Sequence, residues 1–89
     1  MSTITVELQP MAETVTLTES ELVVGLVDGR RLSVPIVWFP RLLHASPGAR
    51  DNWQLLGNGE GIHWPEIDED LSIRGLLLGI PSVEYRKSA

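Results

Sequence analysis

Cysteine is absent from this chain of 89 residues, so disulfides and thiolate chemistry are both excluded. No apolar run approaches the ~18 residues that a membrane helix needs. The first residues of the chain, 1–7, contain neither a basic region nor a long apolar segment, which argues against a signal peptide. We therefore expect no membrane partner, and the cytoplasm is the default location.

Basic residues are also scarce, since seven Lys and Arg stand against twelve Asp and Glu and give a net charge of −5. Nucleic-acid binding depends on phosphate neutralisation by Lys and Arg, so direct binding to DNA or RNA is not expected. The hydrophobic content of 43% is typical of a globular protein. We expect one domain over 1–89, with its core at about 3–81 and a polar tail at 82–89 that frays.

Alternation of apolar and polar residues predicts several short β-strands. They are expected at 3–9, 14–18, in a hairpin over 22–36, at 53–56 and at 62–64. The hairpin turn is marked by Asp28-Gly29, and the apolar residues of both its arms are even-numbered. A two-residue loop would pair odd positions with even ones, whereas a three-residue loop pairs even with even. We therefore predict a loop over 27–29, with Gly29 at positive φ and a bulge.

Two helical segments are expected in the middle of the chain. The segment 37–45 is predicted to be helical, because it contains two i, i+4 pairs, Trp38 with Leu42 and Phe39 with Leu43, and Pro40 is tolerated in a first turn. Ser46 is predicted to cap a second short helical turn through 48–51, with Pro47 at its first position.

A last helix is predicted from the apolar residues near the end of the chain. The spacing of i, i+3, i+4 and i+7 on one helical stripe is met by Ile73, Leu76, Leu77 and Ile80. Asp70 is the predicted N-cap, and Asp68 and Glu69 precede it, where the helix dipole favours negative charge. Gly79 and Pro81 are expected to end the helix. The whole pattern predicts an α+β fold, with a small antiparallel sheet of four to six strands packed against two or three short helices.

Several short segments of the chain resemble one bacterial family. They are Asp28-Gly29-Arg30, Phe39-Pro40-Arg41-Leu42, Asn52-Trp53, Ile62-His63-Trp64-Pro65, Asp68-Glu69-Asp70 and Leu76-Leu77. Over roughly 14–80 the chain resembles the domain of unknown function 2442. The resemblance implies a small α+β domain.

Some members of this family carry a helix-turn-helix DNA-binding domain after it. Others stand alone, encoded beside a second small protein, which suggests toxin–antitoxin-like pairs. This chain ends soon after its last predicted helix and so departs from the regulator form. The family supplies no catalytic residues to carry over.

The acidic stretch around His63 matches no known metal motif, since it has no HExxH pattern and lacks the later Gly and Glu of a calcium loop. We interpret His63 as a hydrogen-bonded histidine beside Trp64, and we expect no metal and no other cofactor. Acids before a helix are more often caps than catalytic groups, and no nucleophile motif is present, so no catalytic residue is assigned.

The main functional hypothesis is a non-catalytic protein-interaction module. Its acidic surface at 66–70 would bind a basic partner protein, such as the product of a neighbouring gene in an antitoxin-like pair. Tryptophan and arginine are enriched where proteins bind each other. The candidate interaction residues are Arg30, Arg41, Trp53, His63, Trp64, Glu66, Asp68, Glu69 and Asp70. One alternative is a self-associating sensory or ligand-binding domain that dimerises through an edge strand at 3–9. A small metal-dependent enzyme is the other.

Overall fold

Six strands and several short helices follow one another in the computed structural model, which describes residues 10–88. The strands are β1 Ala12–Leu17, β2 Glu21–Leu26, β3 Arg31–Pro35, β4 Gln54–Leu56, β5 Gly61–Trp64 and β6 Glu69–Ser72. The helical segments are the 3-10 turn η1 Ile36–Trp38, α1 Pro40–Leu43, α2 Pro47–Asp51, α3 Ile73–Leu77 and α4 Val83–Ser88. The predicted strand 3–9 lies outside the described residues.

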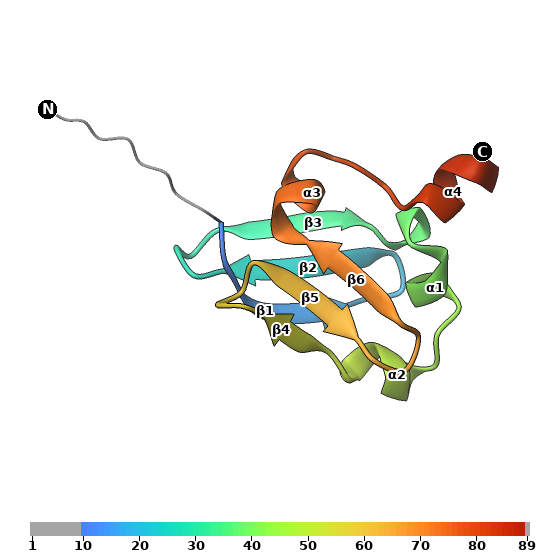
Figure 1. Cartoon of the computed structure of the whole chain (residues 1–89), viewed down its shortest axis with the longest axis horizontal. Coiled ribbons are helices and arrows are strands. Elements are labelled where there is room, and N and C mark those ends of the chain that lie inside the picture. The colour runs from blue at the N-terminus through green and yellow to red at the C-terminus, as the bar shows by residue number, and fades with distance from the viewer. Residues whose placement is uncertain (1–9, 89) are drawn as a thin grey trace, which may run out of the picture.

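The predicted α+β class is confirmed, and the strands are divided between two antiparallel sheets of three instead of forming one larger sheet. The first sheet has the order β1-β2-β3 and the second the order β4-β5-β6. Figure 1 shows the sheets in two layers, with β5 and β6 crossing over the strands of the first sheet. The core therefore lies mainly between two sheets, with α1 and α2 at one end.

The first sheet contains the predicted three-residue hairpin loop. Leu22 pairs with Val34 and Val24 with Leu32, so even positions face even positions as predicted. The amide of Gly29 donates to the carbonyl of Leu26 at 2.9 Å, and Gly29 has φ 96°. The hairpin register and the positive φ were thus both readable from the sequence.

The second sheet has one face toward the core and one toward solvent. Leu55, Ile62 and Leu71 are neighbours across its three strands, and Ile62 is completely buried. The adjacent row across the same three strands consists of Gln54, His63 and Asp70, each of which is the chain neighbour of a residue in the first row. Because successive side chains of a strand point to opposite faces, this second row faces outward.

The core is assembled from both sheets and from the helices that follow them. Its largest fully buried side chains are Trp64, Phe39, Leu22, Ile36, Leu42, Ile62, Ile73 and Val24. The Trp64 indole Nε1 donates to the carbonyl of Arg50 at 3.1 Å, which satisfies its one polar group inside the protein. Trp64 is therefore a core anchor that joins β5 to the end of α2.

The two sheets are tied together at one end by a backbone hydrogen bond. The amide of Ala12 in β1 donates to the carbonyl of Gly59 in the β4–β5 turn at 2.7 Å. Within the second layer, the amide of Ile73 donates to the carbonyl of Glu60 at 3.0 Å and extends the pairing of β5 with β6. Gly59 has φ 106°, and a Cβ at this position would overlap the backbone of Ala12. The turn between β4 and β5 is therefore the link between the layers.

The middle helices agree only in part with the sequence-based prediction. Phe39, at φ −128° and ψ 84°, separates η1 from α1, so 37–45 is not one continuous helix. Pro40 occupies the first position of α1 as predicted. The cap of α2 is confirmed, because the Ser46 side chain accepts a hydrogen bond from the amide of Ala49 at 3.1 Å.

The start of the last predicted helix is corrected by the structure. Asp70 is not its N-cap, because Glu69–Ser72 forms β6 and the Ser72 hydroxyl accepts from the amide of Gly75 at 2.9 Å. A turn after β5, in which Asp68 has φ 52°, sends the chain back to pair with β5 before the helix begins. Strand pairing thus takes the residues that the local pattern assigns to a helix start.

The end of α3 follows the prediction more closely. Gly79 has φ 74°, and the amides of Gly79 and Ile80 donate to the carbonyls of Leu76 and Gly75. This pair of bonds forms a Schellman motif that closes the helix. Leu76 is buried, whereas Leu77 and Ile80 are exposed, so only part of the predicted stripe enters the core. The predicted frayed tail instead forms α4.

Candidate functional site

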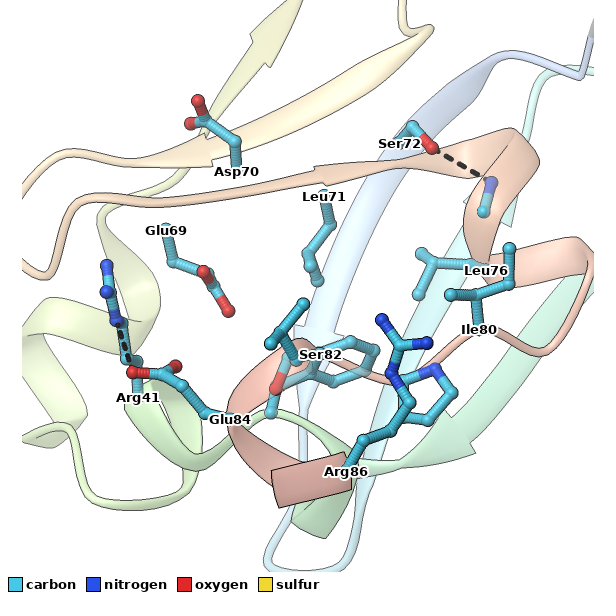
Figure 2. A pocket seen from close by; sticks show the side chains of 14 residues that line it. Arg41, Glu69, Asp70, Leu71, Ser72, Leu76, Ile80, Ser82, Glu84 and Arg86 are labelled. Atoms are coloured by element: carbon cyan, nitrogen blue, oxygen red, sulfur yellow. Dashed lines mark hydrogen bonds and ion pairs between the residues drawn. The ribbon is translucent and has the colours of Figure 1, made fainter. Parts of the chain in front are cut away.

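A groove of about 490 Å³ lies between β6, α3 and α4. Its apolar lining comes from Phe39, Leu71, Leu76, Ile80, Pro81 and Val83, and its charged lining from Arg41, Glu69, Asp70, Glu84 and Arg86. Figure 2 shows Glu69 and Leu71 extending from β6 on the groove side, whereas Asp70 points away from them. The groove thus combines a largely apolar wall with carboxylates and guanidinium groups.

Glu69 reaches this groove from the core-facing side of an edge strand. Its partner across the ladder is Trp64, which is completely buried. Glu69 is only 9% exposed, and its Oε2 atom has no hydrogen-bond partner among the residues that the structure describes. Buried polar atoms in proteins are nearly always paired, so this free oxygen is a specific feature of the site.

The protonation of Glu69 follows from its surroundings. Burial raises the pKa of the Glu69 carboxyl above its ordinary value, because the charged form loses hydration. Arg41 opposes this increase of the pKa, and the negative charges of Glu84 and Asp70 add to it. Among the described carboxyl groups, Glu69 is the one whose pKa is clearly raised.

Arg41 holds together three segments at one end of the groove. Its Nε donates to Glu84 Oε2 at 3.2 Å, and its Nη1 donates to the carbonyl of Asp68 at 2.8 Å. The first contact reaches α4 and the second supports the turn in which Asp68 has a positive φ. The predicted interaction residue Arg41 is therefore occupied with positioning the walls of the groove (Figure 2).

The predicted acidic surface at 66–70 is divided between two faces of the second sheet. His63 Nδ1 is hydrogen-bonded to Asp70 Oδ1 on the outward face. Glu66 Oε2 accepts a hydrogen bond from Asn52 Nδ2 at 3.0 Å, near the start of β4. Because Glu69 points the other way, the structure corrects the prediction that these acids form a single surface.

A family model described as "Protein of unknown function (DUF2442)" matches residues 12–82. The chain belongs to the DUF2442 family. A crystal structure of a protein of unknown function from Rhodospirillum rubrum is similar to this DUF2442 domain, with 30% sequence identity and a TM-score of 0.72. That match covers 84% of this chain and 93% of the other chain.

A solution NMR structure of an uncharacterised protein from Chromobacterium violaceum is also similar, with 22% sequence identity and a TM-score of 0.71. It covers 88% of this chain and 74% of the other, and at this identity the likeness concerns the fold alone. No curated protein matches this DUF2442 domain.

The remaining predicted residues lie outside the groove of the DUF2442 domain. Arg30 forms an ion pair with Asp28 at 2.8 Å in the hairpin between β2 and β3. Trp53 is partly buried and packs against the core, and Trp64 is inside it. Of the nine predicted residues, Arg41 and Glu69 present their side chains to the groove, whereas Asp70 lines it as part of β6 with its side chain pointing away.

One wall of the groove was missed because 82–89 was interpreted as a fraying tail. The Ser82 hydroxyl accepts from the amide of Tyr85 at 3.2 Å, as the cap of α4. Glu84 lies in the first turn of α4, and Arg86 and Lys87 lie in the last. A serine cap, an early acid and late basic residues form a helix signal that was present in the sequence.

Two further properties of this DUF2442 domain concern the part of the chain that the structure describes. Between residues 10 and 88, no group of three or more His, Cys, Asp or Glu side chains is arranged to hold a metal ion. Over the same residues, none of the helices has the length and apolar character required to cross a membrane.

Proposed function

We propose that this DUF2442 domain is a non-catalytic interaction module that binds a partner protein along the groove. The observation that carries this proposal is an apolar rim beside the groove, made of Leu77, Leu78, Ile80 and Val83. These four side chains are between 43% and 66% exposed and lie within one short stretch of the chain. Exposed apolar patches next to polar groups are typical of surfaces that bind other proteins.

The charge of the domain supports a basic partner. The net charge of −5 favours the approach of a positively charged protein and opposes that of nucleic acid. Arg30 and Arg41 are engaged in ion pairs, and the Arg50 guanidinium donates to the carbonyls of Leu42 and Leu43 at 3.0 and 2.7 Å. Arginines that are occupied within the fold are poorly placed to neutralise phosphates.

The chemistry of the groove supports the non-catalytic part of the proposal. Its two hydroxyl groups, of Ser72 and Ser82, accept hydrogen bonds as the caps of α3 and α4. Among the described residues, no histidine lines the groove, so neither serine has an imidazole base beside it. In its specific form, the proposal is an antitoxin-like pair with the product of the neighbouring gene.

Direct binding of the two purified proteins, measured by calorimetry at low and at high salt, tests this proposal. We expect binding that weakens with salt, because opposite charges steer the association. The variant Leu78→Asp, in the rim, should weaken binding at least tenfold, whereas Val27→Asp, an equally exposed apolar position in the β2–β3 loop, should not. Absence of binding at either salt concentration would remove the neighbouring-gene partner.

A further inference from the structure

We propose that Glu69 is the anchor of the groove and binds the cationic group of a lysine or arginine side chain contributed by the partner protein. This inference rests on the proposed function and names the chemistry that the groove recognises. A basic side chain would enter between β6 and α4 and place its charged end at Glu69 Oε2.

The unpaired oxygen of Glu69 is the first argument. Glu69 is nine-tenths buried, and within residues 10–88 its Oε2 atom has no hydrogen-bond partner. A buried acceptor without a donor is unfavourable in the free protein, so a bound donor would be stabilised in the complex. A charged nitrogen donor gives the strongest such bond to a carboxylate.

The shape and lining of the groove are the second argument. Leu71 lies two residues along β6 from Glu69, on the same side of the strand, and Phe39, Leu76 and Ile80 also line the groove. Figure 2 shows Glu69, Leu71, Leu76 and Ile80 around this space. Lysine and arginine side chains have long apolar stems that pack on such residues while their charged ends reach a polar group.

The charges around Glu69 are the third argument. Arg41 is the cation whose charge lowers the pKa of Glu69. Its Nε donates a hydrogen bond to Glu84, and its Nη1 donates one to the carbonyl of Asp68. Glu69 Oε2 is not among the acceptors of Arg41. Arg86, on α4, is exposed and also lines the groove, so its guanidinium could compete with a partner's cation.

The test uses the full chain and a pair of matched peptides, acetyl-Leu-Lys-Leu-amide and the same peptide with norleucine in place of lysine. Both share the apolar stem, and only the first has a positive charge. Titrations followed by NMR of the backbone amides should show at least tenfold tighter binding of the lysine peptide, with shifts concentrated in β6, α3 and α4. Equal affinity for the two peptides, including no binding of either, overturns the proposal.

Two variants separate the role of Glu69 from a general effect of charge. Glu69→Gln keeps the shape of the side chain and should reduce the affinity for the lysine peptide to that for the norleucine peptide. Glu66→Gln removes the same charge at a position outside the groove and should retain the wild-type preference. A Glu69→Gln protein that keeps its amide spectrum and binds the lysine peptide as tightly as the wild type contradicts the proposal.

Arg86→Ala tests whether Arg86 itself fills the site. We expect it to leave the lysine preference unchanged or increase it, because a competing cation is removed. Loss of the lysine preference in Arg86→Ala would contradict the proposal, because the preference would then depend on Arg86 and not on Glu69 alone. If the product of the neighbouring gene binds Glu69→Gln as tightly as the wild type, this inference is wrong and the proposed function still holds. If that product does not bind at all, the proposed partner is wrong and the peptide result is unaffected.

Discussion

At the scale of single residues, Glu69 combines two opposite effects. Its place on the inward side of β6 buries a carboxylate beside Trp64, which makes the folded protein less stable when the group is charged. An inward-pointing charge on an edge strand also discourages pairing with the edge of another molecule. A residue that reduces stability but provides an unsatisfied acceptor in a groove is typical of a binding site.

The stability of the protein should depend on pH through Glu69. Because the folded pKa lies above the ordinary value of 4.5, the folded state binds more protons than the unfolded state between these two values. The stabilisation of the folded state by protonated Glu69 is therefore complete below the pKa of this group in the unfolded chain. It is lost as pH rises through the pKa of Glu69 in the folded protein. The charges that act on Glu69 are those of Arg41 on α1, Glu84 on α4 and the neighbouring Asp70 on β6, and Arg86 on α4 also lines the groove.

Glu69→Gln should remove this dependence and raise the free energy of unfolding by about 1 kcal/mol at neutral pH, since a neutral amide is less costly to bury. Urea unfolding of both proteins between about pH 4 and pH 8 measures the difference. A variant that is less stable than wild type at neutral pH would show that the carboxylate has a stabilising partner.

At the scale of elements, the β2–β3 hairpin could be derived from the sequence because its evidence is local. The position of Asp28-Gly29 and the parity of the apolar residues determine both the loop length and the register. The start of α3 could not be derived in this way. Acids before an apolar helical stripe predict a cap, but pairing with β5 places Glu69–Ser72 in a strand, and that pairing is not visible in the local pattern.

Substitutions at Gly29 test the hairpin. Gly29→Val should destabilise the protein by about 1 kcal/mol or more relative to Gly29→Asn, because asparagine tolerates positive φ and a β-branched residue does not. Among the described residues beyond its chain neighbours, none has an atom within 4 Å of a Cβ at position 29, so the difference reports backbone conformation. Equal midpoints of thermal unfolding for the two variants would count against this loop.

A second pair of variants tests which residue caps α3. Ser72→Ala should reduce stability by about 1 kcal/mol, because the amide of Gly75 loses its acceptor. Asp70→Ala removes only an exposed contact with His63 and should cost about 0.5 kcal/mol or less. The opposite order of the two losses in chemical denaturation would support Asp70 as the cap.

At the scale of the whole molecule, the sequence could not assign strands to sheets. An alternating strand has the same pattern whether it pairs in one sheet of six or in two sheets of three. The division follows from contacts between distant parts of the chain, such as the hydrogen bond from Ala12 to Gly59. The groove likewise requires the complete fold, because its charged lining residues come from α1, β6 and α4, among them Arg41, Glu69 and Glu84.

The link between the two sheets gives a prediction with an internal control. Gly59→Ala should reduce stability by about 2 kcal/mol or more, because its Cβ meets the backbone of Ala12 and its φ is positive. Gly48→Ala, in α2, meets no atom within 4 Å and should be neutral or stabilising by about 0.5 kcal/mol. Similar unfolding free energies for the two variants would mean that the sheets are not joined at this turn.

The pKa of Glu69 in the presence of a basic ligand tests the central claim most directly. The carboxyl carbon of Glu69 can be followed by NMR as pH changes, with the lysine peptide, with the norleucine peptide and with neither. The account predicts that the lysine peptide lowers the pKa of Glu69, because a bound cation stabilises the carboxylate, and that the norleucine peptide does not. A Glu69 pKa that is the same under all three conditions would contradict it.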